Sequence, residues 1–264
     1  MENVQDIRAR SRRDWEEILG RFGLAAKGVS YGLVGALAIG VAVGVGGNTT
    51  SRQGALHSLA GNAFGKIVLV LLACGFAAYA GWRVLQAIQT DKWAKRLGYL
   101  GRAVIYASLT YSAAKIVAGA GGGSSQTQKT HKATAVVLSW PAGRWLVGTA
   151  ALVVIGAGFW NLYRGISRKF EDKWVDRSDI AQRWGGRAGV VGHIARFVVF
   201  GLIGVFALEA AINYDPKDAV GLDGALQKLA HHSYGSFLLG VTAAGLIAYA
   251  LYCFVDARYR DVAA

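Results

Sequence analysis

The chain has 264 residues, of which 53% are hydrophobic and only 17% are charged, against roughly 25% charged residues in an average soluble domain. Glycine is frequent at 36 residues while proline occurs only twice, which excludes both collagen and a disordered, proline-rich chain. A net charge of +13 would suggest nucleic acid for a soluble protein. The apolar excess instead indicates an integral membrane protein, with a buried soluble helical bundle as the alternative.

The first 20 residues form a charged segment with a pattern of its own. Ile7, Trp15 and Ile18 fall near helical spacing, and Arg12 and Glu16 take the other side of the same helix. This pattern predicts an amphipathic helix that lies on the membrane surface. A solvated, disordered lead is the alternative.

Six apolar stretches then follow, each close to the ~20 residues that a spanning helix needs. Three of them are free of charge, and the third and fifth are extended by their flanks. The six expected spans are 28–47, 67–82 (continuing past Arg83), 97–120, 145–163, 188–212 and 237–255.

The positive charge lies mainly on one side of these spans. Sixteen Lys and Arg residues fall before the first span, in the second-to-third and fourth-to-fifth loops and after the last span, whereas five fall in the opposite loops. By the positive-inside rule both termini are cytoplasmic. The sequence thus predicts a multi-pass membrane protein with both termini in the cytoplasm, with membrane lipids, including anionic ones, as partners and no nucleic acid.

Two short blocks recur along the chain and define three repeats. Arg21-x-Gly23-x3-Lys27-x3-Tyr31 returns as Arg96-x-Gly98-x3-Arg102-x3-Tyr106, and in weaker form as Arg187-x-Gly189-x3-His193-x3-Phe197. Gly54-Ala-Leu-His-Ser-Leu-Ala60 returns as Gly224-Ala-Leu-Gln-Lys-Leu-Ala230, with a degraded middle copy at 132–138. The expected organisation is a lead (1–20) and three two-span repeats (21–90, 91–170 and 171–264).

Two spans in each unit mean that every repeat enters the membrane from the same side. The repeats are therefore parallel rather than inverted, and a pseudo-threefold ring of helical hairpins is the expected arrangement. Glycines such as Gly28 and Gly32 lie four residues apart and predict close helix contacts. The predicted fold is an all-α integral membrane protein with six transmembrane helices and an amphipathic N-terminal helix.

These motifs resemble the bacterial domain-of-unknown-function 1206 family of six-span membrane proteins. The resemblance extends over roughly Arg21 to Arg260. It is carried by Gly23–Tyr31, Gly54–Gly65, Gly98–Tyr106, Gly224–Gly235, Tyr249-Ala-Leu-Tyr252 and Ala257-Arg-Tyr-Arg260. It implies a membrane location and a fold, but no activity, cofactor or catalytic residue.

The first block places one basic residue at the same position of each repeat: Lys27, Arg102 and His193. Each lies ~9 Å along its helix from the arginine that opens the block. Pseudo-threefold symmetry would bring the three to one level, where they could form a ring that binds an anion or a lipid headgroup. The alternative is that they extend to the cytoplasmic headgroups without facing one another.

A second candidate pair, Lys115 and Glu209, lies near the outer ends of the third and fifth spans. Charges inside spans are functional candidates. We expect an intramembrane ion pair between them, acting either as a structural clamp or as part of an ion path.

Other chemistry is not indicated. The five histidines lack the spacing of a metal site, both cysteines lie in apolar runs, and no GxSxG or Walker lysine motif occurs. We therefore expect no metal, no cofactor and no enzymatic activity, but a structural, accessory or lipid-associated role. The alternative is a small ion or solute channel or transporter along the pseudo-threefold axis.

Overall fold

The structure, a computed structural model, describes residues 4–43, 63–119, 126–174, 181–230 and 234–260. Within these ranges the chain is helical and contains no β-strand. The six long helices are α1 (Val4–Ala42), α3 (Ala63–Gln89), α4 (Trp93–Val117), α6 (Gly143–Ile166), α7 (Gly186–Asn213) and α9 (Gly235–Tyr259). Shorter elements are α5 (Gln126–Leu138), α8 (Leu222–Ala230), a 3₁₀ turn at Glu171–Lys173 and a π-helical turn at Ala181–Gly185.

Five helices are long and apolar enough to cross a membrane: 17–42, 66–89, 143–166, 183–213 and 235–259. The all-α class and its membrane-compatible helices are thus confirmed. Helix α4 occupies the place of the third expected span, but it is less apolar than the five helices that could cross a membrane. It carries four cations, Lys95, Arg96, Arg102 and Lys115, which lower its mean hydropathy.

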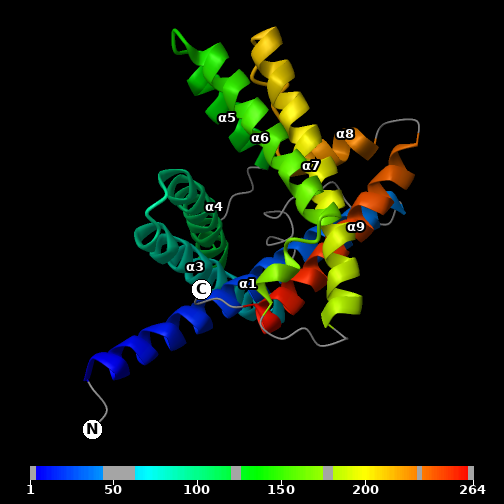
Figure 1. Cartoon of the computed structure of the whole chain (residues 1–264). Helices are drawn as coiled ribbons and strands as arrows, with labels where there is room; N and C mark the ends of the chain where they lie inside the picture. Colours follow the sequence, from blue (N-terminus) through cyan, green and yellow to red (C-terminus); the bar gives the residue numbers. More distant parts are fainter. Residues whose placement is uncertain (1–3, 44–62, 120–125, 175–180, 231–233, 261–264) are drawn as a thin grey trace.

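The N-terminal lead is helical, as expected, but it is not separated from the first span. It continues without a break into the first span, and α1 is a single helix of 39 residues. No proline interrupts this stretch, so nothing stops the intrahelical hydrogen bonds from continuing. At ~1.5 Å per residue α1 is about 58 Å long, far more than the ~30 Å of a bilayer core. Figure 1 shows its first turns extending beyond the other helices.

The six long helices pack in the order α4, α3, α1, α9, α7, α6. A closed ring of three hairpins would require one more packed pair, α4 with α6. These two helices do not pack along each other, and in Figure 1 the α3–α4 pair stands apart from the α6–α7 pair. The closed pseudo-threefold ring is therefore not confirmed, and the helices form an open row with α1 and α9 at its centre.

Glycines permit the close helix contacts in this row. Gly28 and Gly32 of α1 both face Ala250 of α9, at 3.1 and 3.5 Å from where a Cβ would lie. A Cβ on Gly23 would overlap Tyr79 of α3, and a Cβ on Gly192 would overlap Tyr249 of α9. The expectation that these glycines serve packing is confirmed at these positions, since close backbone approach is what joins helices inside lipid.

Large apolar side chains cover the outside of the row. Trp93, Trp145 and Trp184 lie near helix ends and are more than two-thirds exposed. Tryptophans at helix ends are typical of the membrane–water interface. This surface fits a lipid environment and would be unusual for a water-soluble bundle.

Candidate functional site

Two cations from different helices meet at one tyrosine. Lys27 of α1 donates a hydrogen bond from Nζ to the Tyr249 hydroxyl at 2.8 Å. Arg196 of α7 donates to the same oxygen from Nη1 at 2.6 Å. Tyr249 belongs to α9, which lies between α1 and α7 in the row. The three residues therefore join the central helices at one point.

Aromatic rings surround these two charges. The Lys27 ammonium lies 5.0 Å from the centroid of the Tyr249 ring. The Arg196 guanidinium carbon lies 4.6 Å from the Tyr249 ring, 5.1 Å from Phe200 and 5.6 Å from Tyr31. Tyr31 and Tyr249 meet edge to face at 4.8 Å. Cation–π attraction thus stabilises part of the positive charge.

Within the described ranges, no carboxylate forms an ion pair with Lys27 or Arg196. The ion pairs between described residues are Arg21–Glu17, Arg168–Glu171 and Arg260–Asp256, and none includes Lys27 or Arg196. Because both cations reach the same oxygen, their nitrogens are less than about 6 Å apart, and like charges at that separation repel by about 3 kcal/mol at an effective dielectric of ~20. The Arg196 Nε is also buried without a hydrogen-bond partner among the described residues.

Three more arginines extend this site into what we call the basic cluster: Lys27, Arg83, Arg102, Arg164 and Arg196. Arg102 of α4, itself exposed, interacts electrostatically with Arg83, Arg164 and Arg196. Arg83 of α3 is only 5% exposed and donates to the Tyr79 hydroxyl at 2.5 Å and to Gln86. The cluster takes one cation from each of five helices.

His193 lies beside the basic cluster, within electrostatic range of Lys27, Arg164 and Arg196, but its ring packs in an aromatic core. It is 1% exposed, its Nδ1 lies 2.8 Å from the Gly189 carbonyl oxygen, and its ring stacks on Phe170 at 5.1 Å with an interplanar angle of 8°. Tyr249 and Tyr252 meet it edge to face. Of the three residues of the expected ring, the structure brings Lys27 and Arg102 to the basic cluster and places His193 in a neighbouring aromatic core.

The structure identifies Arg196 as the third-repeat counterpart of Lys27. In the first repeat Gly23 packs on Tyr79 and Ala26 packs on Gly75; in the third, Gly192 packs on Tyr249 and Ala195 packs on Gly245. The residue after Ala26 is Lys27, and the residue after Ala195 is Arg196. The third repeat is therefore shifted by three residues, close to one helical turn, relative to the pattern that selects His193.

The sequence does contain a signal for Arg196. One pattern occurs in all three repeats: Gly-x2, then a small residue, then a basic residue, then x3 and an aromatic residue. Its copies are Gly23–Tyr31, Gly98–Tyr106 and Gly192–Phe200. An alignment that starts from Arg21, Arg96 and Arg187 does not find this match. Arg21 and Arg96 lie six residues before Lys27 and Arg102, whereas Arg187 lies nine residues before Arg196.

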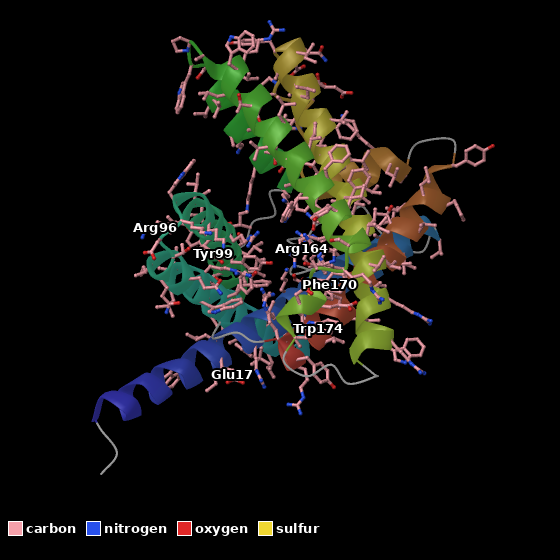
Figure 2. The ribbon with its side chains drawn as sticks, viewed as in Figure 1. Glu17, Arg96, Tyr99, Arg164, Phe170 and Trp174 are labelled. Atoms are coloured by element: carbon pink, nitrogen blue, oxygen red, sulfur yellow. The ribbon has the colours of Figure 1, made fainter. Side chains whose placement is uncertain are left out.

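The aromatic core beside the basic cluster ties the segment after α6 to α9. Figure 2 shows Phe170 and Trp174 in this segment, beside α9. Phe170 meets Tyr252 at 5.0 Å, and Trp174 donates from Nε1 to Asp256 at 3.1 Å. The Asp256 carboxylate also pairs with Arg260 at 2.8 Å. Burial lowers the pKa of Arg260, but Asp256 and neighbouring tyrosines raise it, and the net shift is upward.

Lys115 and Glu209 are not brought together. Both side chains are exposed, and no ion pair between described residues joins them. Lys115 lies 5.3 Å from the ring of Tyr111 on its own helix. Helices α4 and α7 do not pack along each other, so they do not bring Lys115 and Glu209 into contact.

Over the described ranges, no group of three or more His, Cys, Asp or Glu residues could hold a metal ion. Cys253 is buried and Cys74 is exposed, and both are free thiols. The available chemistry is therefore that of the basic cluster, whose cations and tyrosine hydroxyls are suited to a negatively charged oxygen ligand.

Comparison with known proteins agrees with the internal repeats. A family described as Domain of Unknown Function (DUF1206) matches residues 22–89, 97–168 and 191–260. Lys27, Arg102 and Arg196 each lie five residues after the start of their matched segment. The family's own repeat boundaries thus give the same register as the glycine contacts.

The chain is also similar to a full-length bacterial protein. It is 31% identical over 261 residues to the "Uncharacterized protein YxxB" of Bacillus subtilis (strain 168), covering 95% of this chain and 93% of that protein. No solved structure matches the chain.

Proposed function

The chain belongs to the DUF1206 family, and from that premise we propose that it is a non-enzymatic, lipid-associated protein of the bacterial inner membrane. Its basic cluster binds the phosphate group of an anionic lipid. Both termini lie in the cytoplasm, so the cluster lies in the cytoplasmic half of the membrane.

The observation that carries this proposal is the convergence of Lys27 and Arg196 on the Tyr249 hydroxyl without a carboxylate. A neutral hydroxyl accepts hydrogen bonds from both cations but does not offset their mutual repulsion. A phosphate oxygen would offset it, and charge-assisted hydrogen bonds to phosphate are among the strongest in proteins.

The position of the cluster along the helices also supports a headgroup ligand. Arg83 and Arg164 lie near the C-terminal ends of α3 and α6, whereas Lys27 and Arg102 lie in the first halves of the 17–42 span and of α4. Because successive long helices run in opposite directions, all four fall toward the same side of the membrane. Anionic lipids attract basic residues on the cytoplasmic side.

Native mass spectrometry of the full chain with phosphatidylglycerol tests the proposal. The Lys27→Gln/Arg196→Gln double variant should retain about a tenth or less of the bound lipid seen for the native chain, since each lost charge-assisted contact is worth roughly 1.5–3 kcal/mol. Lys115→Gln is the matched control, because it removes one exposed cation outside the cluster. Equal lipid retention by all three proteins would refute headgroup binding at this site.

A small anion channel is the second candidate, and one observation favours it. Arg102 is exposed on α4, the helix at the open end of the row, so the cluster is accessible from one side. Chloride flux from vesicles that contain the purified protein distinguishes the two functions. Flux that disappears in Arg102→Gln favours a channel, and the absence of flux favours a lipid site.

A further inference from the structure

A cavity lies away from the basic cluster, among α5, α7 and α8. It has a volume of about 510 Å³ and is lined by Thr127, His131, Phe206, Lys217, Val220, Gly224, Gln227 and Lys228. This volume is within the ~300–1,000 Å³ of small-molecule sites. Phe206 follows Arg196 by ten residues on α7, about 15 Å along the helix, so the two sites are separate.

The cavity is framed by a hydrogen-bonded junction between α5 and α8. Thr127 donates from Oγ1 to Asp223 at 2.6 Å and accepts from the backbone NH groups of Gly221 and Gly224, each at 3.1 Å. The Thr127 backbone NH also donates to Asp223 at 3.3 Å. Asp223 is 5% exposed and is committed to this junction, so its carboxylate does not line the cavity.

The lining combines positive charge with an apolar wall. Lys217 and Lys228 supply two ammonium groups, and Phe206 and Val220 supply the wall. The Lys228 ammonium lies 4.0 Å from the centre of the Phe206 ring. Among the described residues that line the cavity, none is acidic.

One polar atom in this lining lacks a protein partner. The Nε2 of His131 is buried and has no hydrogen bond within the described part of the chain. A buried nitrogen without a partner is costly. Because solvent does not reach this atom, a ligand in the cavity contacts it only after the imidazole ring turns toward the cavity. His131 also lies on α5, one turn after Thr127, so the junction holds it in place.

We propose that this cavity binds a phosphate-bearing ligand. The two ammonium groups balance the charge of about −2 that a phosphomonoester carries at pH 7, and His131 Nε2 supplies a third contact to its oxygens once its ring turns toward the cavity. Phe206 and Val220 contact the glycerol or acyl part of the ligand. The phosphate comes either from a lipid headgroup such as phosphatidic acid or from a soluble phosphomonoester such as glycerol 3-phosphate.

The test uses the full chain in phosphatidylcholine nanodiscs with each source of phosphate in turn. Binding of glycerol 3-phosphate is measured by titration, and retention of phosphatidic acid is measured by native mass spectrometry. The His131→Ala/Lys228→Gln variant should bind the active probe about tenfold more weakly. Lys129→Gln, an exposed α5 residue outside the lining, should bind it as the native chain does.

The outcomes separate this site from the basic cluster. Binding of either probe that is lost in the cavity variant but kept in Lys27→Gln/Arg196→Gln supports the proposal and identifies the source of the phosphate. Binding of neither probe overturns it, as does binding that the cavity variant leaves unchanged. Thermal unfolding of the cavity variant checks that it is folded, and His131→Gln alone provides a milder change if it is not.

Discussion

Lys27 and Arg196 are 169 positions apart in the chain, yet both donate hydrogen bonds to the Tyr249 hydroxyl. Each occupies the same place in its repeat, directly after a small residue that packs on a glycine of the next helix. The internal duplication thus brings two like charges together at the centre of the helix row. This arrangement is unfavourable for an empty protein and favourable for one that holds an anion.

Tyr249→Phe removes the shared acceptor but keeps the ring and its packing. We expect a loss of about 1–3 kcal/mol in stability, because two half-buried cations lose their hydrogen-bond partner. The loss should be smaller in anionic lipid than in neutral detergent, since a bound phosphate would replace the hydroxyl. Thermal unfolding in both environments measures this difference, and an equal loss in both would argue against a bound anion.

The glycine contacts predict that the same Gly→Ala substitution has different effects on stability in the three repeats. Gly23→Ala and Gly192→Ala place a Cβ against Tyr79 and Tyr249, and overpacking of this kind costs about 1–3 kcal/mol. In contrast, a Cβ on Gly98 meets nothing within 4 Å.

Gly98→Ala is therefore the matched control in the second repeat. It should be neutral or stabilising by up to about 1 kcal/mol, because alanine has the higher helix propensity. Thermal unfolding of the three variants in one detergent checks the order. Equal destabilisation by all three would mean that α6 packs on α4 in the same way as α3 packs on α1.

His193 and Arg196 should differ in the kind of damage that their loss causes. His193→Ala opens a cavity between Phe170 and Tyr252 and should lower stability by about 2–4 kcal/mol, with little change in lipid retention per folded molecule. Arg196→Gln should instead lower lipid retention and change stability little. Thermal unfolding measures the stability, and native mass spectrometry of the same samples measures lipid retention. Lost lipid in a His193→Ala variant of native stability would mean that His193 takes part in lipid binding, as in the expected ring with Lys27 and Arg102.

The buried ion pair predicts a further contrast. Asp256→Asn leaves Arg260 without its carboxylate at side chains that are 3% and 11% exposed, and should cost about 3–5 kcal/mol. Glu171→Gln removes the more exposed pair with Arg168 and should cost less than about 1 kcal/mol. Chemical unfolding measures the stability lost in each variant. Similar stability losses in the two variants would show that Asp256 is not shielded from water.

Much of the fold could be predicted from composition and periodicity. Apolar stretches of the right length placed all six long helices, because a helix in lipid needs about 20 apolar residues whatever it packs against. The glycine seam of Gly28 and Gly32 was also predictable, since small residues spaced by four lie on one helix face. The family resemblance rested on the same motifs and is confirmed.

Other features depend on contacts that the sequence does not display. The continuity of α1 depends on the absence of a stop signal near Gly20, whereas the expected surface helix rested on amphipathicity alone. The register of the third repeat depends on which glycine meets Tyr249, and a shift of one turn keeps the helical face while changing the residue. This explains why His193 was selected and Arg196 was missed.

The central claim is that Lys27 and Arg196 jointly hold one phosphate group. A double-mutant cycle tests it most directly: phosphatidylglycerol affinity is measured for the native chain, Lys27→Gln, Arg196→Gln and the double variant in nanodiscs. The account predicts about tenfold weaker binding for each single variant and a double variant that binds more tightly than independent effects would give, because residues that share a partner are not additive. Unchanged affinity in both single variants would contradict it.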